Sequence, residues 1–372
     1  MTDDIPTMIF DLGSYKIRAG LATDESPRFI IPSAFPSGAH DFPIGKEIPP
    51  SCTPSFAITD GEVEDQDRIN FLFASIFDNF FPSDKPEPVD LRIVLTNPPY
   101  ASKKHMSYIA QATFELLDAD SLIMKPPALY SLIQFSLPTC ICLDVGYDVT
   151  HIVPIQHNFV CAPAVMKSFA AGSALDLFTS ADQFGVYNVK TWQEMEQARK
   201  KKEEFAFSSL DFEKDLDDEN PYPVTCGELL FNPSLFEAAT PEDKEPDERI
   251  STLMEEPSLA EFIKKSIETC DLQNRGTLWN NIIISGGSSK MKGFRERLKA
   301  DLEEIAPSEA KVTLRFPEDP ILAPWLGEKL SINFSKSEPW LNRSEYEEDP
   351  DAVFHKFVQY GLADPNKTEE KK

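Results

Sequence analysis

Two aspartates occupy the same place in a pattern that the chain contains twice, 133 residues apart. Residues 9–15 (IFDLGSY) and 142–148 (CLDVGYD) each place an apolar strand before Asp11 or Asp144 and a glycine two residues after it. A hairpin that turns at that glycine brings backbone N–H groups close to a ligand, as phosphate binding requires. The two carboxylates are expected to face one cleft and to hold a hydrated Mg²⁺, which prefers carboxylate and water oxygens. Aspartate and glycine are also ordinary turn residues, so it is the repetition at domain spacing that favours a ligand site.

The length and charge of the chain limit what the protein can be. A chain of 372 residues exceeds what one hydrophobic core normally supports, so two domains are expected, and 41% apolar residues suffice to build them. The net charge of −26 and the pI near 4.6 argue against direct contact with nucleic acid or an anionic membrane, since either needs a basic face. A basic protein surface is the more natural partner.

The cysteines and the start of the chain indicate the compartment. Six scattered cysteines lack the C-x-x-C spacing of a metal or redox site and are expected to be small core residues in a reducing compartment. The first residues are neither basic nor apolar, and no run of about 18 apolar residues occurs. A soluble protein of the cytoplasm or nucleus is therefore expected. The cysteines are Cys52, Cys140, Cys142, Cys161, Cys226 and Cys270.

The elements that position the two aspartates follow a duplicated α/β plan. Strands are expected from Met8, over 17–21 and over 28–32, followed by a loop-dominated insertion at 34–60, a helix over 65–80 and a buried strand over 91–95. A helix carrying Met106, Ile109 and Phe114 comes next, then a helix over 128–135 and a strand over 139–143. Residues 150–177 repeat the outline of 15–35, which supports two similar mixed-sheet domains.

The second half of the chain combines charged segments with one buried strand. A charged helix is expected over 194–207, and acidic loops over 211–219 and 241–248 are either solvated surface or a docking region for a partner. A buried strand over 282–284 leads into the turn Ser285-Gly286-Gly287-Ser288-Ser289 and a helix over 293–300. A strand that stops at paired glycines before a helix is a common nucleotide contact.

With these pieces in this order, the chain resembles the actin and actin-related protein family over nearly its whole length. The resemblance rests on the two hairpins, on residues 149–155, 210–213, 285–287 and 344–346, and on the C-terminal segment 324–330. It implies an α/β, actin-like ATPase fold with two duplicated ribonuclease-H-like lobes around ATP or ADP and a divalent cation, Mg²⁺ or Ca²⁺. The first lobe would be 1–134 with 34–60 as a reduced subdomain 2, the second 135–322 with an acidic subdomain at about 173–260, and 323–372 would return to the first lobe.

The resemblance also implies a role for particular residues. Asp11 and Asp144 would orient the waters of the metal, and the second lobe would flank the base with Lys202 and Glu203. Those two residues lie in a charged helix that is equally well a solvated face. The further nucleotide contacts would be Gly13, Ser14, Tyr15 and Arg18 at the terminal phosphates, Gly146 beside the β- and γ-phosphates, Gly172 near the ribose, and Gly286, Gly287 and Met291 around the base.

Three departures from the family pattern bear on catalysis. The glutamine that positions the attacking water in actins is Pro127 here, so a main contribution to in-line attack is missing. An aspartate near the ribose is replaced by Tyr147, and the lysine after the first hairpin by Arg18, with Lys16 close by. His151 matches the family histidine near the water path and is either a proton acceptor or a hydrogen-bonded structural histidine.

The function expected from the resemblance is that of a non-polymerising, ATP-binding structural subunit with weak or absent hydrolysis. The insertion at 34–60 is too short for the loop that grips the next subunit of a filament, and the charge of −26 adds repulsion. Its complex would be cytoskeletal (dynactin-like) or chromatin-remodelling, with other subunits, including actin or another actin-related protein, as partners. The alternative is an active ATPase or small-molecule kinase, as in Hsp70-like chaperones and sugar kinases.

A groove that accepts amphipathic helices is expected between the helix over 128–135 and the C-terminal helix. The residues that it offers could equally be plain core; they are Ile133, Phe135, Leu330, Ile332 and Phe334. An apolar docking face rimmed by charge fits a chain that is both acidic and rich in phenylalanine.

Overall fold

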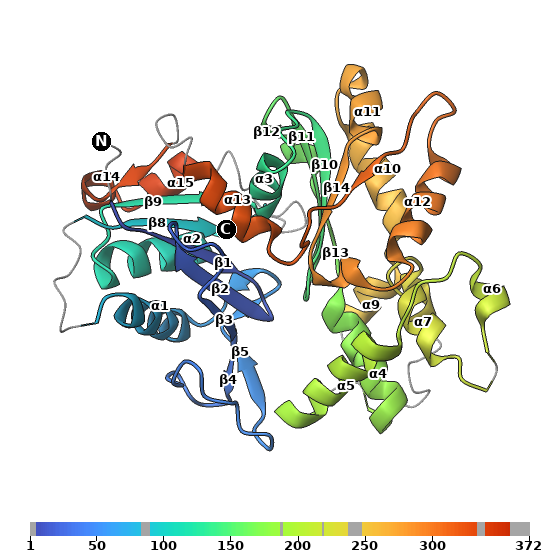
Figure 1. The fold of residues 1–372 in the computed structure, drawn as a ribbon, viewed down its shortest axis with the longest axis horizontal. Helices are drawn as coiled ribbons and strands as arrows, with labels where there is room; N and C mark the ends of the chain where they lie inside the picture. The colour runs from blue at the N-terminus through green and yellow to red at the C-terminus, as the bar shows by residue number, and fades with distance from the viewer. Residues whose placement is uncertain are drawn as a thin grey trace, which may run out of the picture. The chain divides into compact units, whose positions relative to one another are not determined.

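The computed structural model describes residues 5–82, 90–186, 189–217, 219–236, 248–332 and 339–357. Two compact units divide the chain between them. Unit 1 comprises Met1–Ile48, Ser55–Phe135 and Leu322–Lys372, and unit 2 comprises Pro49–Pro54 and Ser136–Ile321 (Figure 1). Unit 1 is therefore built from both ends of the chain.

Unit 1 is organised around a six-stranded mixed sheet with the order β16-β9-β8-β1-β2-β3. β1, β2 and β3 form an antiparallel meander, β8 and β9 run parallel to β1, and β16 pairs antiparallel with β9 at the edge. Every residue of β1 is buried, as expected for a central strand covered on both faces. The strands are β1 (Thr7–Leu12), β2 (Lys16–Leu21), β3 (Phe29–Pro32), β8 (Arg92–Thr96), β9 (Ser121–Lys125) and β16 (Leu341–Asn342).

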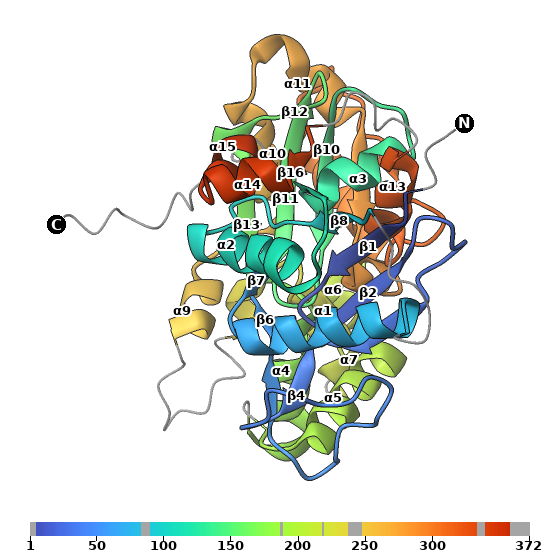
Figure 2. The same ribbon diagram turned by 90° about the vertical axis from the view of Figure 1, so that its left-hand side faces the viewer.

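The helices of unit 1 contribute apolar side chains to one hydrophobic core together with this sheet. Asp65 caps α1 and Ser102 caps α2, each accepting a hydrogen bond from a backbone N–H of the first turn. The single helix expected through Phe114 is instead α2 followed by a π-helical turn over Ala112–Leu116. The helices, whose arrangement is also visible in Figure 2, are α1 (Gln66–Phe80), α2 (Lys103–Gln111), α3 (Pro127–Ile133), α13 (Ala323–Ile332), α14 (Arg343–Glu348) and α15 (Ala352–Phe357).

The insertion after β3 contains two small strand pairs and much irregular backbone. β4 (Ala34–Pro36) pairs with β5 (Pro54–Phe56), and β6 (Ile58–Thr59) pairs with β7 (Glu62–Val63). The stretch Pro49–Pro54 groups with unit 2, because the backbone N–H groups of Trp192 and Gln193 donate to the carbonyls of Cys52 and Pro50.

Unit 2 repeats the arrangement of unit 1 around a second sheet with the order β12-β11-β10-β14-β15 and β13 paired to β11. β10 and β11 form an antiparallel hairpin and β14 runs parallel to β10, just as β8 runs parallel to β1. The duplicated α/β plan is confirmed. The strands are β10 (Cys140–Val145), β11 (Thr150–Gln156), β12 (Phe159–Val160), β13 (Met166–Ser168), β14 (Ile282–Ser285) and β15 (Leu314–Arg315).

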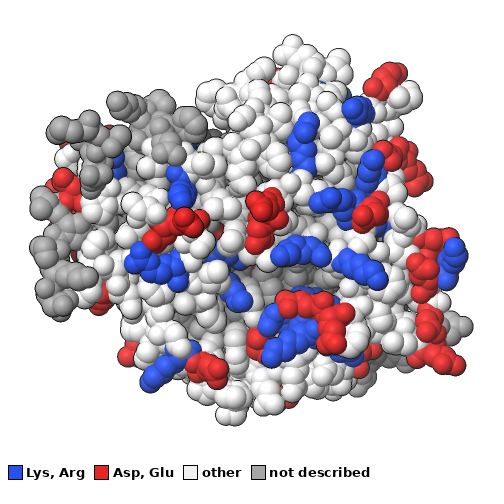
Figure 3. Space-filling view, viewed as in Figure 1, with Lys and Arg blue, Asp and Glu red and all other residues white. Residues whose placement is uncertain are grey.

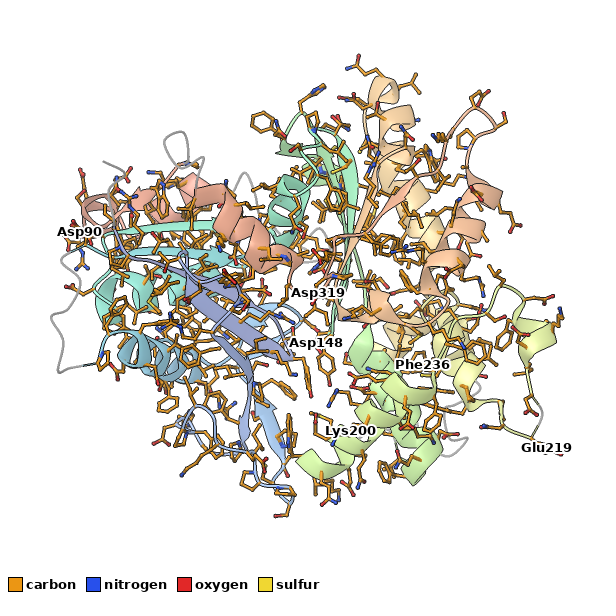
Figure 4. All side chains as sticks on the ribbon, in the orientation of Figure 1. Asp90, Asp148, Lys200, Glu219, Phe236 and Asp319 are labelled. Atoms are coloured by element: carbon orange, nitrogen blue, oxygen red, sulfur yellow. The ribbon has the colours of Figure 1, made fainter. Side chains whose placement is uncertain are left out.

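Helices make up most of the remainder of unit 2. Figure 4 places Phe236, which is fully buried, among them, and Glu219 on the loop beyond α6. Arg297 on α12 forms a two-pronged ion pair with buried Glu228 on α7 and also bonds Asp301. The helices are α4 (Gly172–Phe184), α5 (Trp192–Phe205), α6 (Phe212–Asp215), α7 (Tyr222–Glu228), α9 (Glu248–Met254), α10 (Leu259–Thr269), α11 (Leu272–Trp279) and α12 (Phe294–Ile305).

Charges of both signs are interspersed on the face shown in Figure 3, although the chain as a whole is strongly acidic. Of the first acidic stretch, residues 212–215 form the short helix α6 and residue 218 lies outside the described residues. Residues 241–247 of the second stretch also lie outside them, as does Phe334 of the expected groove. Among the described residues, no helix combines the length and apolarity needed to cross a membrane.

Candidate functional site

The first candidate aspartate, Asp11, lies near the end of β1 with an arginine opposite. Asp11 faces Arg18 in the register of the β1–β2 hairpin, and the Arg18 Nη1 atom lies 2.8 Å from the Asp11 Oδ2 atom. The Thr96 hydroxyl, at the end of the parallel strand β8, lies 3.4 Å from the other oxygen. Burial raises the pKa of Asp11, while Arg18 and the Thr96 hydrogen bond act against that rise. Asp11 is therefore a buried carboxylate whose charge is balanced within its own hairpin.

The second candidate aspartate, Asp144, occupies the equivalent place in unit 2. It faces His151 across the β10–β11 hairpin and Ser285 on the parallel strand β14, whose hydroxyl donates to Asp144 Oδ1 at 3.1 Å. Burial lowers the pKa of His151 to about 3, with a smaller contribution from Lys167. The imidazole is therefore neutral at physiological pH and a weak base, which favours the structural role for His151.

The glycine of each hairpin is required by space. A Cβ atom on Gly13 would lie 2.6 Å from the carbonyl oxygen of Lys16, and one on Gly146 would lie 2.7 Å from that of Val149. Real Cβ atoms do not come so close to a backbone oxygen, so both turns exclude any side chain there. Both hairpins thus turn at the glycine that the repeated sequence pattern indicates. The Gly146 N–H is not left unpaired, because it donates to the Val149 carbonyl at 3.1 Å.

The two residues after Gly13 have partners within unit 1. The Ser14 hydroxyl accepts a hydrogen bond from the Gly61 N–H at 3.3 Å, and the Ser14 carbonyl accepts one from the Ser33 hydroxyl. The Tyr15 ring lies 5.5 Å from the Lys16 ammonium. The first turn is therefore anchored to the loop that follows β3 and to the turn between β6 and β7.

Several predicted nucleotide contacts of unit 2 lie next to one another. The Gly172 N–H, at the start of α4, donates to the Gly146 carbonyl at 3.1 Å, and the Ser288 hydroxyl donates to the same carbonyl at 2.9 Å. Gly286 has φ +90°, and a Cβ atom there would lie 2.3 Å from the Val145 carbonyl oxygen. The turn after β14 therefore packs directly on the second hairpin and needs glycine for both conformation and space.

Gly287 and Met291 complete that turn. Gly287 is exposed, and a Cβ atom there would meet only the Ile321 side chain, at 4.0 Å. Met291 follows the 3₁₀ turn over Gly287–Lys290, and its sulfur accepts a hydrogen bond from the Ser208 hydroxyl at 3.6 Å. Both residues thus belong to unit 2, on the segment that follows β14.

Lys202 belongs to this cluster, whereas Glu203 faces solvent. The Lys202 ammonium lies 2.6 Å from the Asp176 carboxylate and donates to the Gly172 carbonyl at 2.9 Å. Its side chain is only 11% exposed, so the solvated-face interpretation is wrong for Lys202. The Glu203 side chain is 59% exposed and pairs with Arg199 one helical turn earlier, which agrees with that interpretation.

Asp176 is a residue of this cluster that the sequence reasoning missed. It is buried on α4, accepts a hydrogen bond from Tyr147 and pairs with Lys202, so it connects the start of α4, the second hairpin and α5. Burial raises its pKa and Lys202 opposes the rise. The available signal was an aspartate inside the otherwise apolar stretch 174–178 (ALDLF), where a buried acid needs a cationic partner.

Glu328 on α13 was also missed. Its side chain is fully buried, and burial together with the nearby charge of Asp11 raises its pKa well above the usual range. Neither carboxyl oxygen has a hydrogen-bond partner among the described residues.

Pro127 is the first residue of α3 and follows Pro126 at the cap position, so the start of this helix offers no side-chain amide.

The repeated motif defines a class of protein. A strand hairpin and a parallel strand place one carboxylate beside a glycine turn, and the chain contains this motif twice. The family model for actin matches residues 2–219 and 218–359. The chain belongs to the actin family, whose members generally bind a nucleotide together with a divalent metal.

The two aspartates fit a cation unequally. Asp144 and the Ser285 hydroxyl offer oxygen donors of the kind that Mg²⁺ or Ca²⁺ prefers, directly or through water. Asp11 instead has a guanidinium against one of its oxygens. The residues present therefore fit a hydrated cation at Asp144 and fit it poorly at Asp11.

Proposed function

We propose that the protein is a non-polymerising, ATP-binding structural subunit of a larger complex, with weak or absent ATP hydrolysis. The observation that carries this proposal is Pro127 at the start of α3, where the resemblance places the water-positioning glutamine of actins. A proline side chain can neither donate nor accept a hydrogen bond, so it cannot orient water for in-line attack. Nucleotide binding depends on other residues, the hairpin turns and the segment after β14, which are retained.

A bound nucleotide is useful without turnover. A ligand that binds only the folded state stabilises that state by mass action, so a site that hydrolyses slowly still has a structural role. ATP or ADP with Mg²⁺ or Ca²⁺ is the proposed cofactor, with the hydrated cation near Asp144 and the base beside Gly286, Gly287 and Met291. The complex is proposed to be cytoskeletal and dynactin-like, or chromatin-remodelling.

The short insertion supports the non-polymerising role. Only residues 37–53 connect β4 to β5, and part of this stretch is hydrogen-bonded to the residues that begin α5. Little of it is therefore left to form a subunit-gripping loop.

The proposed docking groove has partial support from α3 and α13. Leu330 is 39% exposed, while Ile133 and Ile332 pack partly against the core of unit 1, as the plain-core interpretation requires. We propose that Leu330 and half-buried Phe135 contribute to docking an amphipathic helix of another subunit. Affinity purification of the tagged protein, with identification of the chains that co-purify in stoichiometric amounts, tests this membership.

A single-turnover assay tests the catalytic part of the proposal. Protein loaded with γ-labelled ATP and Mg²⁺ is expected to release phosphate far more slowly than actin under the same conditions, because the water-positioning amide is absent. Pro127→Gln is the matched variant and is expected to release phosphate faster than the parent. Phosphate release by the parent at the rate of actin or faster would favour the active ATPase of the same superfamily instead.

Binding is tested by titration calorimetry with Mg-ATP. Asp144→Asn is expected to weaken binding at least tenfold, because it removes the negative oxygen that would hold the hydrated cation. Asp271→Asn, which changes an exposed aspartate of the same unit, serves as the control and should retain the parent affinity. Equal affinity of Asp144→Asn and the parent would contradict the proposed cation position.

A further inference from the structure

Unit 2 contains two cysteines, Cys161 and Cys270, that are far apart in the sequence and close together in the fold. Cys161 directly follows β12, and Cys270 lies between α10 and α11. Both side chains belong to the hydrophobic core of unit 2, and both thiols are free. The proposed nucleotide site uses neither of them.

Two hydrogen bonds hold the segments that carry these cysteines against each other. The Ser266 hydroxyl on α10 donates to the Ala164 carbonyl at 2.6 Å, and the Asn274 amide on α11 donates to Gln156 Oε1 at the end of β11, at 2.9 Å. The two segments therefore run antiparallel. Each cysteine lies between the two bonded residues of its own segment, so the fold places the two thiols opposite each other.

The two thiols are in contact, and the backbone around each is fixed. A side-chain hydrogen bond joins the Cys161 and Cys270 thiols. The Cys161 N–H donates to the Pro154 carbonyl at 2.8 Å, and the Cys270 carbonyl accepts a hydrogen bond from Arg275 Nε at 3.0 Å. The pair is thus held by ordered structure on both sides.

The two thiols differ in their access to solvent. Cys161 is partly exposed, whereas Cys270 is only 2% exposed. Burial, together with the neighbouring Cys161 sulfur, raises the pKa of Cys270 to about 12, so Cys270 stays a thiol at physiological pH. An oxidant from solvent therefore reaches Cys161 first, with Cys270 beside it to react second.

We propose that Cys161 and Cys270 form a peroxide-sensitive pair, which hydrogen peroxide converts into a disulfide within unit 2. The Cys161 thiolate attacks one peroxide oxygen, so an S–O bond forms, the O–O bond breaks, and the released hydroxide takes up a proton to become water. The Cys270 sulfur then attacks the sulfur of the Cys161 sulfenic acid. An S–S bond forms, the S–O bond breaks, and the Cys270 proton leaves with the hydroxyl group as a second water.

The disulfide would fasten the segment after β12 to the junction between α10 and α11. The loop that it closes contains α4 to α10, the larger part of the helices of unit 2. A bond that closes a long loop restricts the unfolded chain, so the oxidised protein resists unfolding more than the reduced protein does. A reducing compartment keeps the pair as thiols until an oxidant appears.

The test treats the purified full chain with hydrogen peroxide and then alkylates the remaining thiols with N-ethylmaleimide under denaturing conditions. Unreduced protein is cleaved at acidic residues and mapped by mass spectrometry, and Asp144 and Asp148 separate Cys161 from Cys142. The peptides of Cys161 and Cys270 are expected to be joined, and dithiothreitol should release them. The urea midpoint of the oxidised parent is expected to exceed that of the reduced parent.

Three variants assign the role of each thiol. Cys161→Ser is expected to leave Cys270 fully alkylated and to remove the effect of peroxide on the urea midpoint. Cys270→Ala should stop the reaction at the Cys161 sulfenic acid, which dimedone traps, and this readout does not depend on the stability of the variant. The control Cys52→Ser changes another partly exposed cysteine and should form the disulfide as the parent does.

Other patterns of oxidation would overturn the inference. Oxidation of Cys161 to sulfenic or sulfinic acid with Cys270 still alkylated would do so, as would full alkylation of both thiols after peroxide treatment. A bond between Cys140 and Cys142, whose buried sulfurs lie 3.7 Å apart on one strand, or a bond from Cys161 to a second copy would also overturn it. None of these outcomes bears on nucleotide binding, so the proposed function is tested separately.

Discussion

At the scale of single residues, the buried acidic side chains differ in whether a positively charged side chain pairs with them. Asp11 is paired with Arg18 and Asp176 with Lys202, whereas Glu328 has neither an ion-pair partner nor a hydrogen-bond partner among the described residues. A buried carboxyl without a partner avoids ionisation by raising its pKa. Glu328 is therefore protonated in the folded protein at pH values where an exposed glutamate is charged.

Glu328→Gln is expected to stabilise the protein at neutral pH and to make its stability less dependent on pH. Above a pH of about 4.5 the unfolded chain loses the Glu328 proton while the folded protein keeps it, so the free energy of unfolding falls as the pH rises. The slope is about 1.4 kcal/mol per pH unit until the folded carboxyl itself ionises. Glutamine has nearly the same shape and no proton to lose.

Denaturant unfolding of the parent and Glu328→Gln at pH 5, 6, 7 and 8 measures this difference. The stability gain should increase with pH, and it should be absent near pH 4.5 and below. The control Glu309→Gln, at an exposed residue, should follow the parent at every pH. A constant difference between Glu328→Gln and the parent would show that Glu328 ionises normally in the folded protein.

The sequence predicted residues whose signal is local and missed those whose partners are distant. Asp11, Gly13, Asp144 and Gly146 stand in two short patterns, and the structure places both pairs in equivalent hairpins. Glu328 becomes notable only because α13 brings it near Asp11, more than 300 residues earlier. Such contacts depend on tertiary packing, which periodicity and spacing do not encode.

At the scale of elements, the strands of both hairpins and the parallel strands β8 and β14 were predicted because their apolar runs are short, continuous and bounded by turn residues, whereas β9, β15 and β16 were not predicted. The strands β1, β8, β10 and β14 all fall where the pattern places them. The π-helical turn at Ala112–Leu116 was not predicted, because an apolar helical periodicity does not distinguish a π-turn from the end of an α-helix. The short β6–β7 pair was also missed, since two-residue strands leave no alternation to detect.

The contact between α3 and α13 depends on a glycine. A Cβ atom on Gly327 would lie 2.0 Å from the Tyr130 carbonyl oxygen, so Gly327→Ala must push the two helices apart. We expect it to lower the free energy of unfolding by about 2–3 kcal/mol, as overpacking does. Gly276→Ala in α11 is the matched control: apart from its chain neighbours and the backbone of its own helix, no atom lies within 4 Å of the new Cβ, and a gain of about 0.5–1 kcal/mol is expected from helix propensity.

Thermal and denaturant unfolding of the two glycine variants measures this contrast. Equal stability of Gly327→Ala and the parent would mean that α13 does not pack on α3 as closely as the structure shows. A loss of stability in Gly276→Ala would mean that its surroundings are more crowded than the structure shows.

At the scale of the whole molecule, the two sheets show the duplication, but the charged side chains around the two hairpins differ. Unit 1 pairs its hairpin aspartate with arginine, and unit 2 carries the Lys202–Asp176 cluster beside its hairpin. The recurring pattern allowed the duplicated fold to be predicted from sequence. These electrostatic differences could not be predicted, because they depend on which side chains meet across strands and helices.

The protein is expected to remain in the supernatant under conditions that polymerise actin. High-speed sedimentation in Mg-ATP and added salt should leave it soluble, because the insertion is short and a net charge of −26 disfavours close packing of copies. Actin sedimented in parallel is the positive control. Pelleted material that shows helical filaments by electron microscopy would refute the non-polymerising role.

The entry of both chain ends into unit 1 has a consequence for biosynthesis. The ribosome releases all of unit 2 before it releases α13, which covers α3, and β16, which closes the β9 edge of the first sheet. A nascent chain must therefore hold an unfinished N-terminal half, with an open strand edge, until α13 and β16 have been synthesised. A premature stop codon before residue 322 would leave that half permanently unfinished, however well the middle of the chain folds.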